Sequence, residues 1–403
     1  MKPYYKLARH EGNKTLFDLV EMSIIATLSE EPLHIHAEGL RGTGKTTILR
    51  TARQILPKIT RIKSCLYNCD PQKPHCPLHR DLTPDEVEAL GTEEITMPFL
   101  EISHSAKVGT VAGSIDLAKI TDTSKPQAAL LPGIIPQAHR GIIFIDEINR
   151  LADTSPEITD ILLDVMGNKP GRIQIEEAGM PVVDIPVNVS VWAASNPDEE
   201  PGPLEEIRRQ LSDRFDMVFY MGRPSQVDVV ANMLEESDNC RRNRVEDEQI
   251  IEEKVSAIAE KLAEMSGRYD GAEMPDFLRS FIARLYIKYS LESLRAIEAI
   301  QQGAILHSII KNQKQVQMYD VLEVVPLALK HRVDGDTLVK IMNSLENKSS
   351  RDSILSFRDT KSSKDKSLEE QEEAAHFDNG GRRMRDISRN ELIASERVLN
   401  PKD

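Results

Sequence analysis

The sequence predicts an α/β fold in which a parallel sheet is flanked by helices and followed by a small α-helical domain and a polar tail. Two observations lead to this prediction. Strand-like and helix-like segments alternate from Thr15 to about Gly222, which is the pattern of a parallel α/β sheet. From Gln226 to about Arg332, apolar residues recur every three or four positions, which is typical of helices. With 403 residues, the chain is long enough for two or three domains.

The individual elements follow from the local patterns. Short apolar runs predict strands at 33–37, 99–102, 141–145, 189–193 and 217–220. Helical spacing is clearest at 250–265, 277–289, 294–310 and 321–329. We therefore place a first domain at 1–225, a helical domain at 226–340 and a tail at 341–403. The tail has mixed charge and few apolar residues, so we expect it to be disordered, with docking on a partner as the alternative.

Composition limits the classes of partner and compartment. The net charge is −14 and the pI is about 5.3, so no general attraction draws the chain to nucleic acid or to an anionic membrane. Residues 1–14 lack the apolar core of a signal peptide, and the stretch 126–145 is interrupted by prolines and charges. The four cysteines have no secretory context. We expect a soluble, cytoplasmic protein.

A glycine-rich motif of the form G-x-x-x-x-G-K-[ST] lies between a predicted strand and a predicted helix. It reads Gly39-Leu40-Arg41-Gly42-Thr43-Gly44-Lys45-Thr46, and Thr47 begins the helical run. The glycines let consecutive N–H groups point at phosphate oxygens, and the helix adds the positive end of its dipole. Lys45 would reach the β- and γ-phosphates, and Thr46 would ligate Mg²⁺. The motif predicts binding of a nucleoside triphosphate, ATP, together with Mg²⁺.

Polar residues follow two of the predicted strands. Asp146 would hold the Mg²⁺, and Glu147 would act as the general base on the attacking water. Asn196 lies just beyond the strand at 189–193, where open α/β sheets bind ligands, and could position that water. A turn or a helix cap is the alternative for each of these features.

Arginines later in the chain could stabilise charge in the transition state. Arg214 lies just before the last predicted strand, with Arg208 and Arg209 as competing candidates. Arg295 begins a helix in the second domain, from which it could reach back to the nucleotide and report its state. A surface salt bridge is the alternative for each arginine.

The order of these motifs resembles that of an AAA+ ATPase. The details resemble the ATPase (I) subunit of magnesium chelatase and the MoxR-like chelatase-type ATPases. This similarity covers about 15–335 and depends on 131–149 (LPGIIPQAHRGIIFIDEIN), Ser195-Asn196-Pro197 and 210–216 (QLSDRFD). It implies the AAA+ fold with a helical lid, and a ring, usually a hexamer. It also implies partners: a second AAA+ subunit with an integrin-like (VWA/MIDAS-type) metal-binding domain, and a large catalytic subunit that inserts Mg²⁺ into protoporphyrin.

The resemblance also assigns roles to residues. It implies that Asn196 is sensor 1, that Arg214 is the finger reaching into a neighbour's site, and that Arg295 is sensor 2. The segment 109–120 looks like the family's insert in the second helix, and 171–185 looks like the hairpin before sensor 1. In related ATPases these elements move and touch substrate, while ordinary surface segments packed between subunits are the alternative. The family's usual LLDRF is LSDRF here, and the stretch 198–209 is also reshaped, so the substrate need not be a porphyrin.

A cysteine-rich segment lies between the predicted strands at 33–37 and 99–102. Its spacing is Cys65-x3-Cys69-x6-Cys76-x2-His79, with prolines between the candidate ligands and with His75 nearby. Thiolates and imidazole at this density suit a structural, tetrahedral Zn²⁺. An iron–sulfur cluster would need a fourth ligand, and Cys240 is remote in sequence. A segment that binds no metal is the third alternative.

Together, these features predict a ring-forming, Mg-dependent ATPase. It would drive metal insertion, or the remodelling of a metalloprotein, through a separate partner. One alternative is a nucleic-acid motor, which predicts a basic pore hairpin, whereas 171–185 carries mostly acidic charges. The other is a nucleotide switch that scaffolds partners, against which Glu147, Asn196 and Arg214 argue. We expect neither nucleic acid nor a membrane as partner.

Overall fold

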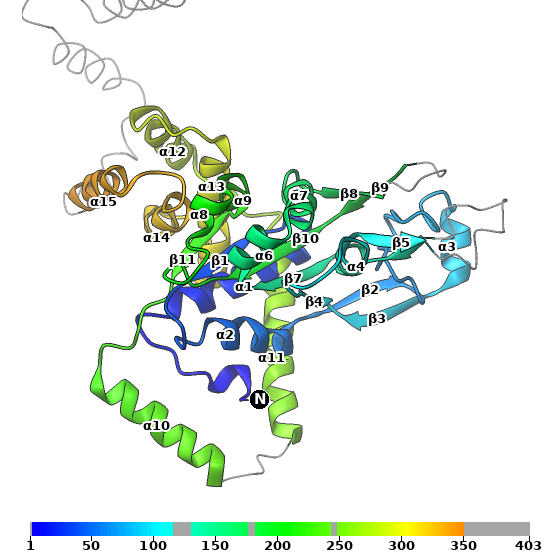
Figure 1. The fold of residues 1–403 in the computed structure, drawn as a ribbon, viewed down its shortest axis with the longest axis horizontal. Helices are drawn as coiled ribbons and strands as arrows, with labels where there is room; N and C mark the ends of the chain where they lie inside the picture. The colour runs from blue at the N-terminus through cyan, green and yellow to red at the C-terminus, as the bar shows by residue number, and fades with distance from the viewer. Residues whose placement is uncertain (1, 116–129, 176–181, 243–247, 350–403) are drawn as a thin grey trace, which may run out of the picture. The chain divides into compact units, whose positions relative to one another are not determined.

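A parallel sheet forms the centre of the computed structural model, which describes residues 2–115, 130–175, 182–242 and 248–349. The strand order is β11-β1-β10-β7-β4, and all four neighbouring pairs are parallel (Figure 1). The strands are β1 (Ile35–Glu38), β4 (Phe99–Ile102), β7 (Gly141–Asp146), β10 (Val189–Ala194) and β11 (Met217–Tyr220). Each of these strands overlaps a predicted one. In β1, β10 and β7 every residue except the terminal Asp146 is buried, as expected for strands covered on both faces.

Helices cover both faces of the sheet, and the alternation of side chains along the strands shows how. On one face, Trp192 of β10 donates through its Nε1 to Ser23 Oγ of α1 (Lys14–Leu28) at 2.8 Å. On the other face, Ile143 and Val191 belong to a buried cluster that includes residues of α6 (Ile148–Thr154) and α7 (Pro156–Val165). Successive side chains of a strand point to opposite faces, so the sheet is the middle layer of three.

The remaining elements before the helical region are short. The helices and 3-10 turns are η1 (Tyr4–Lys6), α2 (Lys45–Thr51), η2 (Ala52–Ile55), α3 (Pro84–Leu90), α4 (Val108–Ala112), α5 (Ile134–Gln137), α8 (Leu204–Ile207) and α9 (Arg209–Arg214). The strands outside the central sheet are β2 (Lys58–Ile62), β3 (Thr92–Thr96), β5 (Gly113–Ile115), β6 (Leu130–Pro132), β8 (Gly171–Ile175) and β9 (Val183–Val187). They pair antiparallel as β2–β3, β5–β6 and β8–β9.

Two of these pairs overlap the segments for which the resemblance implied an insert and a hairpin. The segment 109–120 includes most of α4 and all of β5, and its last residues, 116–120, lie outside the described part of the chain. The segment 171–185 includes β8 and the first residues of β9, which pair antiparallel, and 176–181 between them are also outside it. The third pair, β2–β3, carries the cysteine-rich segment between its strands.

The helical region follows the sheet. It consists of α10 (Val227–Arg242), α11 (Glu248–Ser266), α12 (Asp276–Lys288), α13 (Leu294–Ile310), α14 (Met318–Leu329) and α15 (Gly335–Ser349). Helix α13 packs against α14 and α1, and α14 packs against β11. The chain divides into two compact units, 1–342 and 343–403. Helix α15 continues past the predicted boundary at 340, and the predicted tail beyond 349 lies outside the described residues.

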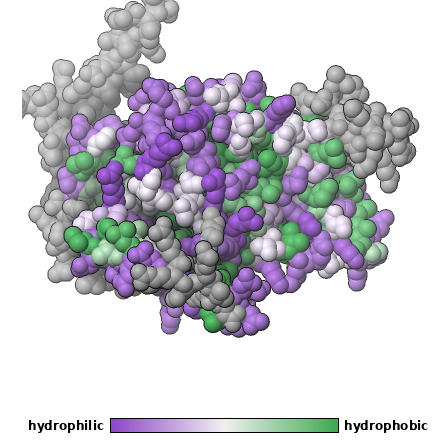
Figure 2. Space-filling view, turned by 60° about the horizontal axis from the view of Figure 1, so that its bottom comes forward, coloured by the Kyte–Doolittle hydropathy of each residue, from purple (hydrophilic) through white to green (hydrophobic). Residues whose placement is uncertain are grey.

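The described helices contain no segment that is long and apolar enough to cross a membrane. Figure 2 shows a face on which hydrophilic residues predominate and hydrophobic residues form scattered groups. Scattered surface hydrophobic residues are normal for a folded chain.

Candidate functional site

The phosphate-binding motif forms the loop between β1 and α2. Gly39 has φ +142° and Gly44 has φ +95°, conformations that L side chains rarely adopt. A Cβ on Gly39 would also lie 2.7 Å from the carbonyl oxygen of Met221. The glycines are therefore required by the backbone path, which leads directly into the N-terminus of α2.

Lys45 lies across this loop. Its Nζ donates to the carbonyl oxygens of Gly39 at 2.5 Å and of Leu40 at 2.9 Å. Burial lowers the pKa of Lys45, and the carboxylates of Asp146 and Glu199 act in the opposite direction. The ammonium group thus occupies the mouth of the loop, where a phosphate could exchange for the two carbonyl oxygens.

Thr46 and Asp146 come together although they are 100 residues apart. The Thr46 hydroxyl donates to Asp146 Oδ1 at 3.2 Å, and Arg50 of α2 lies 3.4 Å from Asp146 Oδ2. A hydroxyl and a carboxylate at this distance, beside a phosphate loop, form the oxygen-ligand set that Mg²⁺ takes in such sites. The chemistry of these donors fits the metal.

Glu147 follows Asp146 at the carboxyl end of β7 and precedes α6. Its φ is +53°, an uncommon value for a residue other than glycine. Its carboxylate is 43% exposed and lies 3.3 Å from Arg150 Nη1. The bend that ends β7 therefore leaves the carboxylate accessible to water, as a general base requires.

Asn196 follows β10, the strand next to β7. The register pairs Ala194 with Asp146, which places the two residues after β10 beside the acidic pair. Asn149 of α6 donates to the carbonyl oxygen of Asn196 at 3.4 Å and to that of Gly202 at 3.1 Å. These hydrogen bonds hold the loop after β10 against the start of α6.

Arg214 and Arg295 meet at the amino ends of the strands, on the edge of the sheet opposite the phosphate loop. Arg214 Nη1 donates to the carbonyl oxygen of Gly167 at 3.4 Å, and Arg295 donates to the same oxygen and, at 3.2 Å, to that of Met166. Arg295 also lines a cavity of about 650 Å³ with His34, which immediately precedes β1. The four residues of β1 span about 13 Å, and the phosphate loop begins only after them. The expectation that Arg295 reaches back to its own nucleotide is therefore not met, because α13 holds it at the amino ends of the strands.

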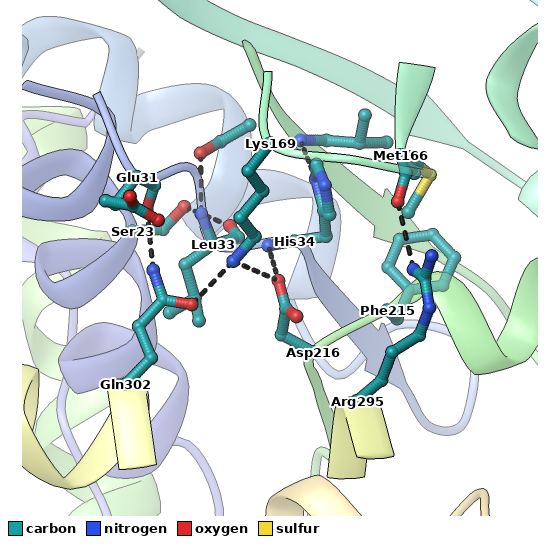
Figure 3. A network of polar contacts seen from close by, with 12 residues as sticks. Ser23, Glu31, Leu33, His34, Met166, Lys169, Phe215, Asp216, Arg295 and Gln302 are labelled. Carbon is teal, nitrogen blue, oxygen red and sulfur yellow. Dashed lines mark hydrogen bonds and ion pairs between the residues drawn. The ribbon is translucent and has the colours of Figure 1, made fainter. Parts of the chain in front are cut away.

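A polar network lies beside Arg295 (Figure 3). Lys169 donates to Gln302 of α13 at 2.6 Å and lies 3.7 Å from Asp216. Asp216 in turn accepts from the backbone N–H of His34 at 2.7 Å. The network ties the helical region to the connection between α7 and β8, which leads into the hairpin before Asn196.

Sequence reasoning missed a buried histidine behind the phosphate loop. His36 of β1 lies 2.8 Å from the hydroxyl of Ser195, the residue before Asn196. Burial lowers the pKa of His36 to about 4, so the ring is neutral near pH 7. Its position on an apolar strand between two site loops is the only signal that could have identified it.

Of the other arginines considered, Arg209 forms an exposed pair with Glu292 at 3.2 Å, with side chains 76% and 82% exposed. Exposed pairs of this kind contribute little to stability. Arg209 is thus the weaker candidate for a role at the nucleotide.

The predicted cysteine cluster is also assembled. Cys65, Cys69 and Cys76 are buried, none is in a disulfide, and the candidate ligand atoms of these residues and His79 all lie within 4.8 Å of one another. The hydrogen bonds from Cys69 and Cys76 hold the pKa of the Cys65 thiol well below its usual range. The cluster packs against 137–140, before β7, and so lies at the edge of the sheet away from the phosphate loop.

Comparison with known proteins gives three findings. Residues 279–352 match the AAA lid domain family. The chain is 26% identical over 324 residues to the magnesium-chelatase 38 kDa subunit of Acidiphilium rubrum, covering 80% of this chain and 89% of that protein. It is 28% identical over 303 residues to the chloroplastic magnesium-chelatase subunit ChlI-2 of Arabidopsis thaliana, and this alignment covers 74% of this chain and 69% of that protein.

A crystal structure of a candidate ATPase from Cytophaga hutchinsonii aligns with a TM-score of 0.50 and 18% identity. It covers 84% of this chain and 89% of that one. This similarity concerns the fold alone. With the lid match, it confirms the predicted parallel sheet flanked by helices and followed by a helical lid.

Proposed function

Because this chain is an AAA+ ATPase that resembles the ATPase subunits of magnesium chelatase, we propose that it hydrolyses Mg·ATP as a ring-forming motor subunit. The ring would drive metal insertion, or the remodelling of a metalloprotein, through a separate partner. The observation that carries this proposal is the contact between Thr46 and Asp146 at 3.2 Å, beside Glu147 and at the head of the phosphate loop. This contact supports a site in which Thr46 and Asp146 bind the metal and Glu147 acts as the base.

Different residues of the chain would bind the phosphates and the metal ion. The backbone N–H groups of 39–46 and the N-terminus of α2 hold the phosphates, and Lys45 leaves its two carbonyl partners to pair with them. Thr46 and Asp146 would hold Mg²⁺ directly or through water. The ion neutralises charge on the phosphate oxygens when it is bound.

Glu147 and Asn196 act on the water. Glu147 accepts the proton of the attacking water, and its carboxylate pairs with Arg150 at 3.3 Å. Asn196, held beside it by Asn149, orients that water. The output of the reaction is a conformational change in the ring rather than a second chemical step.

Arg214 and Arg295 complete the site of a neighbouring subunit. Both lie about one strand length from their own phosphate loop, and both are held at the same carbonyl oxygen, that of Gly167. An arginine that stabilises charge on the transferred phosphoryl group must be within hydrogen-bonding distance of it. A ring of identical subunits, with head-to-tail contacts, meets this requirement.

The partner would be a separate protein that carries a VWA/MIDAS-type domain or a porphyrin site. We propose a D-like subunit of that type or a chelatase catalytic subunit. A nucleic-acid motor is less consistent with the acidic charges on the β8–β9 hairpin, such as Asp184. A non-hydrolysing switch would not need Glu147.

Glu147→Gln tests the proposal. It keeps the size of the side chain and removes the base, so ATP binding should persist while turnover falls by about 10²–10⁴-fold. The matched control is Glu157→Gln, an exposed acid on α7, which should keep normal turnover. Mass spectrometry of proteins retained by the ATP-bound variant would identify the partner. Normal ATP hydrolysis by Glu147→Gln would refute the assignment of the base.

A further inference from the structure

The loop between β2 and α3 brings together four groups that the ATPase site does not use. Cys65, Cys69 and Cys76 are 3%, 0% and 0% exposed, and His79 lies beside them. We propose that these four residues bind one structural Zn²⁺, which fastens this loop to the segment that leads into β7. The proposal is independent of the proposed function, since the cluster lies at the other edge of the sheet.

The geometry is close to that of a tetrahedral site. Ligand atoms about 2.3 Å from a zinc ion lie about 3.8 Å from one another. The four candidate atoms here lie within 4.8 Å of one another, and Cys76 Sγ is 3.3 Å from His79 Nδ1. Shifts of about 1 Å would therefore close the shell around the ion.

Backbone hydrogen bonds orient one of the candidate sulfur ligands. The backbone N–H groups of His75 and Cys76 donate to Cys69 Sγ at 3.5 and 3.4 Å. Such outer hydrogen bonds orient metal-binding sulfur atoms and tune their charge. The guanidinium of Arg61 donates to the carbonyl oxygen of Cys65 at 3.0 Å and pairs with Glu93 at 2.8 Å, which fixes the backbone at the first candidate ligand.

Two histidines compete for the fourth position, and the structure assigns it to His79. A turn in which the N–H groups of His79 and Arg80 donate to the carbonyl oxygen of Cys76 directs His79 back toward the sulfur atoms. His75 Nδ1 is 3.3 Å from Cys69 Sγ, but its ring stacks on that of His139 with centroids 3.7 Å apart. His75 therefore acts as an outer contact of the cluster.

The loop is joined to the strand that carries the acidic pair. Asn68 donates to the carbonyl oxygen of Gln137 at 2.6 Å, and Arg140 pairs with Asp70 at 3.0 Å. His139 in turn accepts from the N–H of Asn188, which precedes β10. A metal-held loop would thus fix the start of β7, which ends at Asp146, and the start of β10, which precedes Asn196.

The test is metal analysis of the full chain, purified without a histidine tag, as wild type, His79→Ala and His75→Ala. We expect about one zinc per wild-type chain, loss of it in His79→Ala and retention in His75→Ala. Iron in place of zinc, no bound metal in the wild type, or equal metal in the two variants would overturn the proposal. Loss in His75→Ala alone would overturn the assignment of His79.

A second measurement does not depend on the variants folding. Wild-type protein stripped of metal and titrated with Co²⁺ should show the visible bands of tetrahedral cobalt and the near-ultraviolet bands of cobalt–thiolate bonds. Removal of the metal with a chelator should lower the Tm by about 5 °C or more, because binding of the metal contributes to folding. Absence of the cobalt bands, or an unchanged Tm after complete removal of zinc, would contradict the inference.

Discussion

If Arg214 acts in a neighbour's site, two inactive variants should restore each other. The perturbation is a mixture of Arg214→Ala and Glu147→Gln, each of which should lose about 10²-fold or more in turnover. In this structure Arg214 lies at the carbonyl oxygen of Gly167, near the amino ends of the strands, whereas its own phosphate loop follows β1, whose four residues span about 13 Å. A hydrogen bond to a phosphate oxygen needs a distance of about 3 Å. The arginine therefore cannot complete the site of its own chain in this arrangement.

The size of the recovery follows from the arrangement of the sites. In a ring with head-to-tail contacts, each site takes Glu147 from one subunit and Arg214 from the next. In an equimolar mixture, about one site in four has both residues intact, so about a quarter of wild-type turnover should return. If both residues acted within one chain, every site would lack one of them and no activity would return.

The assay measures phosphate release after the two variants are mixed without nucleotide and then assembled with ATP. Native mass spectrometry verifies that mixed rings form. Arg209→Ala is the matched control, because its exposed pair with Glu292 should contribute little. Mixed rings as inactive as the separate variants would refute the shared site.

Two further predictions concern the part of the sheet next to the phosphate loop. Thr46→Val removes the hydroxyl that contacts Asp146 and should lower Mg-dependent turnover by about 10²-fold or more. Thr46→Ser retains a hydroxyl and should keep normal turnover. Equal turnover in both variants would contradict the metal role of Thr46. Burial lowers the pKa of His36 to about 4, which is below its value in the unfolded chain. Between about pH 6.5 and 4 the unfolded state therefore binds more protons than the folded state. The free energy of unfolding should fall as the pH falls through this window. His36 alone should contribute a loss of about 2 kcal/mol between pH 7.5 and 5, and urea unfolding of His36→Asn should show a correspondingly smaller loss; an unchanged pH dependence would argue against a neutral, buried His36.

Much of the central fold was predictable from local patterns. The predicted strands at 99–102 and 217–220 and the helix at 294–310 have the observed bounds. These elements have continuous apolar runs or clear helical spacing, so their own residues specify them. The strands β2 and β3 were missed. The exposure of β3 alternates between intermediate and fully exposed residues, and such a strand carries too little apolar signal to be recognised alone.

The candidate site was predictable to different degrees at its two edges. The contact between Thr46 and Asp146 was expected, because both follow strands of a parallel sheet, whose carboxyl ends meet at one edge. The convergence of Cys65, Cys69, Cys76 and His79 was also expected, and the structure brings these residues together. The partner of Arg295 was not predictable, since it is a backbone carbonyl oxygen 128 residues away.

This difference has a physical origin. Some features depend only on neighbours within a few residues: the backbone conformation at Gly39 and Gly44, the apolar strands and the helical spacing of α13. For this reason the sequence alone was sufficient to predict the phosphate loop and the layers around it. The position of Arg214 and Arg295 depends on how α13 packs against α1 and on where α7 ends. Such packing is a sum of many weak contacts between distant segments. Only the folded chain shows that these arginines lie a strand length from the phosphate loop that they were expected to serve.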